Sequence, residues 1–253
     1  MMNLGGDERI YPASMTKIMT ALLTIENLPD LNETITVPED IFEELTAQDA
    51  SVAGFNPYEQ PTVRDLLYGV LLPSGADACE TLARAVGGSE EGFVAMMNQK
   101  AEELGLTNTH FENCTGLHND NHYSTCRDIA VLMSECLKSD TFREIVTREV
   151  YTTEATASHP EGITLYDTML HRFTSYEMST TLENGAVIEG GKTGFTDEAG
   201  QCLVSFAEYG GEEYILVTAE AMTDSGSAVD SIADASTCLL YTSDAADDRI
   251  SVD

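Results

Sequence analysis

Residues 11–23 of the chain read YPASMTKIMTALL, and this segment predicts both a buried helix and a reactive serine. Its apolar residues recur at the spacing of one helix face: Met15, Ile18, Met19, Leu22 and Leu23. Ser14 and Lys17 are three residues apart, so a helix places their side chains next to each other. A serine hydroxyl is a weak nucleophile until a neighbouring base removes its proton, and a neutral lysine can be that base. The segment therefore predicts a nucleophile and its base.

Two further short motifs carry polar groups suited to a peptide substrate. Ser74-Gly75-Ala76 opens a helical pattern, and Lys192-Thr193-Gly194 follows two glycines on a predicted strand and is followed by Phe195. A glycine-rich strand lets a substrate backbone approach closely, and the lysine and threonine offer a charge and a hydroxyl to a carboxylate. Each motif alone also has a plain structural interpretation, because Ser74 could simply cap the helix.

The three motifs in this order, S-x-x-K, S-G-A and K-T-G, match the pattern of penicillin-binding proteins and class A β-lactamases. Longer segments narrow the resemblance: YPASMTKIMTALL, LLPSGADAC, AEELGLTNTHFENCTGLHNDNHYST and GGKTGFTDEAGQCLVS. They closely resemble the D-alanyl-D-alanine carboxypeptidase family of low-molecular-weight penicillin-binding proteins. The resemblance extends from about Asp7 to about Leu240.

This resemblance implies a role for each motif residue. Ser14 would be the acylated nucleophile, Lys17 its general base, and Ser74 a relay that passes a proton to the leaving D-alanine. Substrate binding would fall to Lys192, Thr193, Gly194 and Phe195: the first two would hold the terminal carboxylate, and the backbone N–H groups of Ser14 and Phe195 would form the oxyanion hole. The family needs no metal and no cofactor.

Ala76 departs from the family pattern, which usually has asparagine at the third position of the middle motif. Alanine cannot donate a hydrogen bond to the substrate amide. A lost bond of this kind typically costs roughly 1–3 kcal/mol. If the bond acts only in the transition state, the rate falls by about ten- to a hundred-fold.

The order of the remaining elements predicts an α+β fold. Helical patterns begin near Ala13, Thr62, Ser74, Phe93 and Ile129, and Asp140 is expected to cap a short helix through Val146. Strands are expected at residues 149–153, 186–194, 202–207 and 214–219, the last two joined in a hairpin through Gly210 and Gly211. Together with the resemblance, this order predicts a DD-peptidase/β-lactamase-like fold, in which an antiparallel sheet is flanked by helices and carries an inserted, mainly helical lobe.

The domain interpretation takes residues 1–237 as one catalytic domain, truncated at its N-terminus, with the helical lobe at about 28–147. A last helix is expected over Ser225–Leu240, and residues 238–253 are interpreted as a non-native tail. A missing leading segment is expected to supply a sheet strand next to that helix, so this chain should be less stable than a longer homologue.

Composition excludes some classes of partner and function. The formal net charge is −32, so the chain repels phosphate backbones and nucleic-acid binding is not expected. No apolar run is long enough to span a membrane, and no signal peptide is present in this fragment. The family works outside the cytoplasmic membrane, so the expected location is extracytoplasmic, with membrane association only through segments missing from this chain.

Several cysteines, histidines and one glutamate suggest alternatives. Cys114, His118, His122 and Cys126 are evenly spaced with His110 nearby, which suggests zinc, but they lie in a loop-like stretch. Glu103 faintly resembles the deacylating glutamate of class A β-lactamases, yet a solvated helix position suits it better. Buried free thiols are expected at Cys79, Cys136 and Cys202.

The leading hypothesis is a serine D-Ala-D-Ala carboxypeptidase that acts on peptidoglycan stem pentapeptides and is inhibited covalently by β-lactams. Two alternatives stay open at this point. One is a catalytically weak penicillin- or muropeptide-binding module, suggested by Ala76. The other is a β-lactamase-like hydrolase, which needs a glutamate-activated water.

Overall fold

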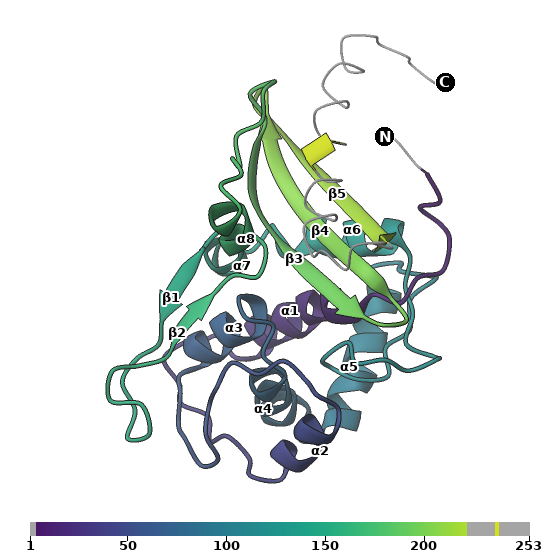
Figure 1. Ribbon diagram of the computed structural model, residues 1–253. Coiled ribbons are helices and arrows are strands. Elements are labelled where there is room, and N and C mark those ends of the chain that lie inside the picture. The colour runs from purple at the N-terminus through teal and green to yellow at the C-terminus, as the bar shows by residue number, and fades with distance from the viewer. Residues whose placement is uncertain (1–3, 222–235, 238–253) are drawn as a thin grey trace.

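The computed structural model describes residues 4–221 and 236–237, which form an α+β fold (Figure 1). A short 3-10 helix η1 (Ala13–Thr16) runs directly into helix α1 (Lys17–Asn27). The helices that follow are α2 (Ile41–Ala47), α3 (Val63–Leu71), α4 (Ala76–Gly87), α5 (Glu90–Glu103), α6 (Cys126–Cys136), α7 (Asp140–Val146) and α8 (Leu170–Ser175).

The main sheet has three antiparallel strands in the order β3-β4-β5: β3 (Val187–Thr196), β4 (Gly200–Tyr209) and β5 (Glu212–Ala221). The predicted hairpin between the last two turns at Gly210 and Gly211, and both have the positive φ that such a turn requires. A second, two-stranded sheet pairs β1 (Val150–Thr152) with β2 (Thr164–Tyr166). Within the described residues β3 is an edge strand, so one of its sides can face the helices.

One hydrophobic core joins the helices to the sheet. The apolar face predicted for residues 15–23 is buried, and Ile18, Met19 and Val70 are inaccessible to solvent. The same core includes Val204 and Phe206 of β4. Figure 1 shows α1 passing beneath the sheet with α3 and α4 on its other side. The shared core fixes η1, at the start of α1, against strand β3.

The structure corrects several local predictions. The first helix begins as a 3-10 turn, and Ser139, not Asp140, caps α7 by accepting the Phe142 N–H. Helices α2 and α8 and strand β2 were not predicted. The helix expected over Ser225–Leu240 and the tail 238–253 lie, apart from two residues, outside the described part of the chain. Within that described part, no helix has both the length and the apolar character needed to cross a membrane.

Candidate active site

Ser14 and Lys17 form the pair that the sequence predicts. The Lys17 ammonium group lies 3.1 Å from Ser14 Oγ and donates a second hydrogen bond, 2.6 Å long, to the carbonyl of Thr115. Pro12 precedes η1, and Ala13 has a φ of +44° that turns the chain into the helix. Lys17 is only 3% exposed, so its side chain has little freedom to leave this position.

The two lysines of the motifs are both easier to deprotonate than an exposed lysine. Burial lowers the pKa of Lys17, although Cys79, Cys114 and Asp77 oppose the shift. Burial, and then the nearby Lys17 charge, lower the pKa of Lys192 to about 7. Burial is therefore the cause of the shift at Lys17, and the repulsion between the two lysines contributes to the shift at Lys192. A neutral Lys17 can accept a proton.

Strand β3 brings the third motif next to Ser14, the candidate nucleophile. A Cβ atom placed on Gly194 would lie 3.0 Å from the backbone nitrogen of Ser14, so this contact leaves little room for a side chain. Lys192 is buried and donates to the carbonyl of Thr193 over 3.0 Å. The Thr193 hydroxyl lies 2.6 Å from that of Thr168. Phe195, 56% exposed, follows at the mouth of the site.

Ser74 lies in an unusual backbone conformation that the sequence did not predict. Its φ is +66°, in the left-handed region that non-glycine residues seldom adopt. The N-cap of α4 is Gly75, so the interpretation of Ser74 as a helix cap is wrong. The Ser74 hydroxyl is buried and has no hydrogen-bond partner among the described residues. A buried, unsatisfied hydroxyl is costly in a fold, which suits a group kept for a substrate.

Backbone contacts connect the Ser74 segment to strand β3. The Leu72 carbonyl accepts the N–H of Thr168 over 3.1 Å, and the Thr168 hydroxyl contacts Thr193. Gly75 N–H donates to the Gly69 carbonyl over 2.8 Å, which bends the chain back onto α3. The middle and third motifs are therefore joined through residue 168, more than 90 residues from Leu72 along the chain.

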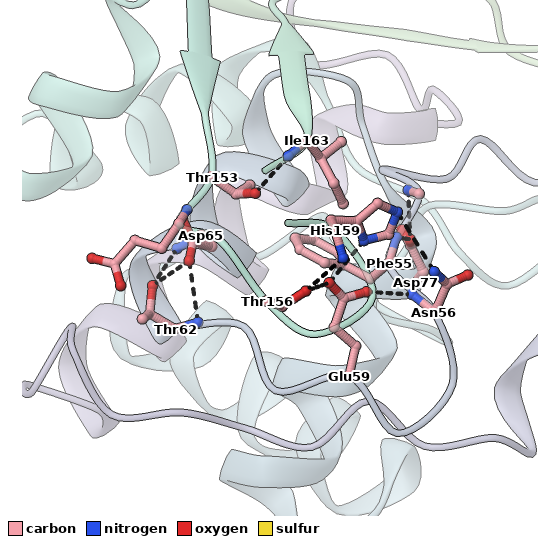
Figure 2. Close-up of polar contacts among 12 residues, drawn as sticks. Phe55, Asn56, Glu59, Thr62, Asp65, Asp77, Thr153, Thr156, His159 and Ile163 are labelled. Carbon is pink, nitrogen blue, oxygen red and sulfur yellow. Dashed lines mark hydrogen bonds and ion pairs between the residues drawn. The ribbon is translucent and has the colours of Figure 1, made fainter. Parts of the chain in front are cut away.

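Asp77, just after the middle motif, anchors a loop beside the site (Figure 2). Its carboxylate accepts the backbone N–H groups of Ala53, Gly54 and Phe55 at 2.7, 2.9 and 3.0 Å. Hydrogen bonds from backbone donors to a charged acceptor are among the stronger ones in proteins. The loop is thus held against the start of α4.

The same loop is tied to a distant hairpin through Glu59 (Figure 2). The Glu59 carboxylate accepts from the Asn56 backbone and pairs with His159, both at 2.8 Å, and also accepts from Thr156. Burial raises the pKa of Glu59, but these hydrogen bonds outweigh it and leave the pKa below its usual value. The residues between β1 and β2 are therefore fixed to the wall of the helical block.

A cleft of about 740 Å³ opens between α2, the start of α5, the loop around Thr115 and the end of β3. Thr115 and Phe195, which flank the candidate catalytic groups, belong to its lining. Most of its charged lining residues are acidic: Glu44, Asp49, Glu80, Glu90, Glu112, Asp197 and Glu198, against Arg84 and His118. Ser14, Lys17, Ser74 and Lys192 do not line this cleft, which borders the candidate catalytic groups through Thr115 and Phe195.

Gly116 allows the loop that holds Lys17 to approach η1. Its φ is +82°, and a Cβ atom there would lie 1.9 Å from the carbonyl oxygen of Ala13. The side chain of Asn113 accepts the N–H groups of Thr115 and Gly116 and so shapes this loop. The close approach places the Thr115 carbonyl within reach of Lys17.

Gly116→Ala is expected to lower the free energy of unfolding by roughly 2–4 kcal/mol, because strain at positive φ adds to a backbone clash. Gly88→Ala is the matched control: its φ is +76°, but nothing lies within 4 Å of the added atom. That control should lose only about 1 kcal/mol. Urea unfolding of both variants measures the difference, and equal losses would contradict the importance of the close contact.

The residues that suggested zinc have other partners. His122 is buried, accepts the Glu112 N–H at Nδ1, and contacts Thr16 Oγ1 over 2.8 Å through Nε2. Burial lowers its pKa to about 3, so it stays neutral. His118 lies near Asp120 and Glu198. Among the described residues, three potential ligand atoms come together only at Glu80, Glu90 and Cys114, where the thiol keeps its proton because burial raises its pKa.

Three cysteines and Glu103 lie in the environments that the sequence predicts for structural residues. Cys79, Cys136 and Cys202 are buried free thiols, as predicted. Glu103 is exposed and pairs with Lys100 and Gln99 on its own helix.

Sequence reasoning missed three neighbours of the motif residues. The Thr115 carbonyl holds Lys17, Thr168 contacts Thr193, and Asp167 is a buried carboxyl close enough to Lys192 to interact with its charge. Burial raises the pKa of Asp167 to about 7. A carbonyl has no side-chain signature, and the fold alone brings residues 167 and 168 to the site.

Comparison with known proteins shows to which family the chain belongs. The model of the D-alanyl-D-alanine carboxypeptidase family matches residues 1–223. A D-alanyl-D-alanine carboxypeptidase of Bacillus subtilis is 36% identical over 87% of this chain and 54% of its own length. One of a Streptomyces species is also 36% identical, over 83% of this chain and 72% of its own. The chain thus spans about half the length of the Bacillus relative.

Solved structures give the same result for the fold. The crystal structure of a Streptomyces DD-transpeptidase superimposes with a TM-score of 0.81 at 31% identity, covering 95% of this chain and 90% of the other. A D-alanyl-D-alanine carboxypeptidase of Mycobacterium tuberculosis gives a TM-score of 0.71 at 28% identity, over 86% and 76% of the two chains. The predicted DD-peptidase fold is confirmed. With its motifs, its fold and the match over residues 1–223, the chain belongs to the D-alanyl-D-alanine carboxypeptidase family.

Proposed function

We propose that this chain is a serine D-Ala-D-Ala carboxypeptidase that removes the terminal D-alanine from peptidoglycan stem pentapeptides. The observation that carries the proposal is the 3.1 Å contact between Lys17 Nζ and Ser14 Oγ. Lys192 is buried within range of the Lys17 charge, and the buried Ser74 hydroxyl has no hydrogen-bond partner among the described residues. This combination supplies a nucleophile, a base, a relay and a carboxylate-binding cation.

Acylation begins when neutral Lys17 takes the hydroxyl proton of Ser14. Ser14 Oγ then attacks the carbonyl carbon of the penultimate D-alanine. The proton passes through the Ser74 hydroxyl to the amide nitrogen as the C–N bond breaks, so D-alanine leaves as a neutral amine. Water, deprotonated by Lys17, hydrolyses the ester, and Ser14 recovers its proton. β-Lactams acylate Ser14 by the same route.

Binding of the substrate falls to strand β3. Lys192 and Thr193 hold the terminal carboxylate, which pairs with an ammonium group and a hydroxyl. The backbone N–H groups of Ser14 and Phe195 stabilise the oxyanion, and Gly194, which has no side chain, lets the start of η1 pack against strand β3. Removing one such donor typically costs roughly 10²–10³ in rate.

The cell envelope, outside the cytoplasmic membrane, is the location that fits this substrate. Peptidoglycan stem peptides and β-lactams are the proposed partners. Fractionation of cells that express the gene from its natural locus tests the location.

The test of the activity is intact-protein mass spectrometry after incubation with benzylpenicillin, together with D-alanine release from a diacetyl-Lys-D-Ala-D-Ala peptide. A stable adduct that maps to the peptide containing Ser14, with D-alanine release, is the expected result. Release of D-alanine without any adduct at Ser14 would overturn the assignment of the nucleophile.

Ala76 favours a second candidate, a binding module with weak catalysis. Ala76 is buried at the start of α4 and has no side-chain donor for a substrate amide. An adduct without D-alanine release would support this second function. Rapid hydrolysis of a chromogenic cephalosporin would instead indicate a β-lactamase-like enzyme.

Ala76→Asn is expected to raise kcat/KM for D-alanine release by about tenfold, because it restores one hydrogen-bond donor. Ala78→Asn, also at a buried alanine of α4, controls for the effect of bulk and should not raise the rate. Steady-state kinetics on the tripeptide decide the question. An unchanged kcat/KM in a folded Ala76→Asn variant would show that another group already fills this role.

A further inference from the structure

Glu80, Glu90 and Cys114 form a side-chain cluster that the proposed mechanism does not use. One ligand-type atom from each lies within 4.8 Å of the others. The Cys114 thiol donates to Glu80 Oε1 over 3.4 Å, and the Cys114 backbone N–H donates to Glu90 Oε1 over 3.2 Å. The carbonyl of Cys114 accepts the Thr20 hydroxyl over 2.7 Å. Residue 114 is thus fixed at its side chain, its N–H group and its carbonyl.

The next residue along the chain holds the catalytic base. The carbonyl of Thr115 accepts the 2.6 Å hydrogen bond from Lys17, whose ammonium also contacts Ser14. Since Thr115 directly follows Cys114, the two glutamates act together with Asn113 to set the position of the acceptor that orients Lys17. Small errors in such a position are known to cost up to about 10²-fold in rate.

The cluster has a proton that it can lose near neutral pH. Glu80 is only 8% exposed, and burial together with the Glu90 carboxylate raises its pKa to about 8. Below that pH, Glu80 is a neutral acid that hydrogen-bonds to Glu90. Above it, two carboxylates face each other, and like charges in a partly buried site repel.

The other charged groups around Glu80 do not remove this repulsion. Arg84 lies 3.8 Å from Glu80 Oε2 but is closer, at 2.7 Å, to Asp40. The remaining titratable groups that line the same cleft or flank the cluster are Glu44, Asp49, Glu112, His118, Asp197, Glu198, Asp77, Cys79 and Lys17. Most of these groups are acidic, so they disfavour a second charge on the pair.

We infer that Glu80 and Glu90 are positioning residues for the catalytic lysine, holding the Cys114–Thr115 segment in place while the pair keeps one proton. The inference rests on the proposed function in that Lys17 is the base there. It adds a pH-dependent step: when the pair loses its proton, the segment shifts and the Thr115 carbonyl no longer aligns Lys17 with Ser14.

Three variants test the role through acylation by benzylpenicillin, measured from pH 6 to pH 9 with a chelator present. Glu80→Gln keeps a neutral donor and acceptor and should acylate at the wild-type rate at pH 7. Its rate relative to wild type should grow about tenfold between pH 7 and pH 9, because a group of pKa about 8 is about nine-tenths ionised at pH 9. Glu80→Ala should acylate about ten- to a hundred-fold more slowly than wild type at pH 7. Glu44→Gln, another carboxyl of the cleft, should follow wild type.

A readout that needs no activity separates this inference from the proposed function. The chain has only four lysines, so NMR of ¹³C-labelled lysine side chains can follow Lys17 alone. The Lys17 signal should shift with a midpoint near pH 8 in wild type and lose this step in Glu80→Gln. If the step is present without any acylation, the proposed function fails and the inference stands. Identical Lys17 titrations, or identical pH profiles of acylation, in wild type and Glu80→Gln would overturn the inference.

Discussion

Ser14→Ala is expected to lower D-alanine release by at least about 10⁴-fold and to leave no benzylpenicillin adduct on the protein. Without the hydroxyl there is no atom at this position that can form the acyl ester, and Lys17 then has no proton to take. The loss should appear in kcat, since the proposed mechanism assigns substrate binding to Lys192 and Thr193 of strand β3.

Ser74→Ala is the control, because it removes the buried hydroxyl of the middle motif and keeps Ser14. That variant should acylate more slowly but still give an adduct at Ser14. Circular dichroism should show both variants folded, because Ser14 donates no hydrogen bond on which the fold depends. A stoichiometric adduct on Ser14→Ala would place the nucleophile elsewhere.

Lys17→Met is expected to lower the rate of acylation by about 10²–10⁴-fold, the usual contribution of a general base. Methionine fills a similar volume in the buried position, so the fold should survive. The two hydrogen bonds of Lys17, to Ser14 and to the Thr115 carbonyl, are both lost. Stopped-flow measurement of acylation by a chromogenic β-lactam gives the rate.

The pH profile distinguishes loss of a base from general damage. Burial lowers the pKa of Lys17, so in wild type the acylation rate should fall as the pH drops through that lowered pKa and the lysine becomes protonated. Lys17→Met should lack this acidic limb. Lys100→Met, at a lysine paired with Glu26 away from the site, should keep it. An unchanged acidic limb in Lys17→Met would mean that another group is the base.

The elements with strong periodicity could be predicted from the sequence, and those set by tertiary contacts could not. The apolar face of residues 15–23 and the apolar runs of β4 and β5 required only local patterns. Helix α2 and strand β2 are short, and β2 is defined by its pairing with β1, so their sequences carry weak signals. The conformation of Ser74 depends on contacts of its neighbours with Gly69 and Ser51, which lie outside the motif.

In the candidate site, too, local spacing predicts some contacts, and only tertiary packing produces the others. Ser14 and Lys17 could be paired from their spacing alone, because a single helical turn joins them. The partners of the other motif residues come from distant segments: Thr115 reaches Lys17 through a loop, and Thr168 reaches Thr193 after a separate hairpin. Such contacts follow from the packed core and leave no periodic pattern in the sequence.

The positive φ angles of Ala13 and Ser74 have a consequence for how the protein responds to heat. Each such angle costs about 1–2 kcal/mol in a residue with a side chain, and only the surrounding packing maintains it. Relaxation of the backbone at these two positions would release that conformational strain. As the temperature rises, they should relax while the core is still folded, so activity should be lost at a lower temperature than secondary structure.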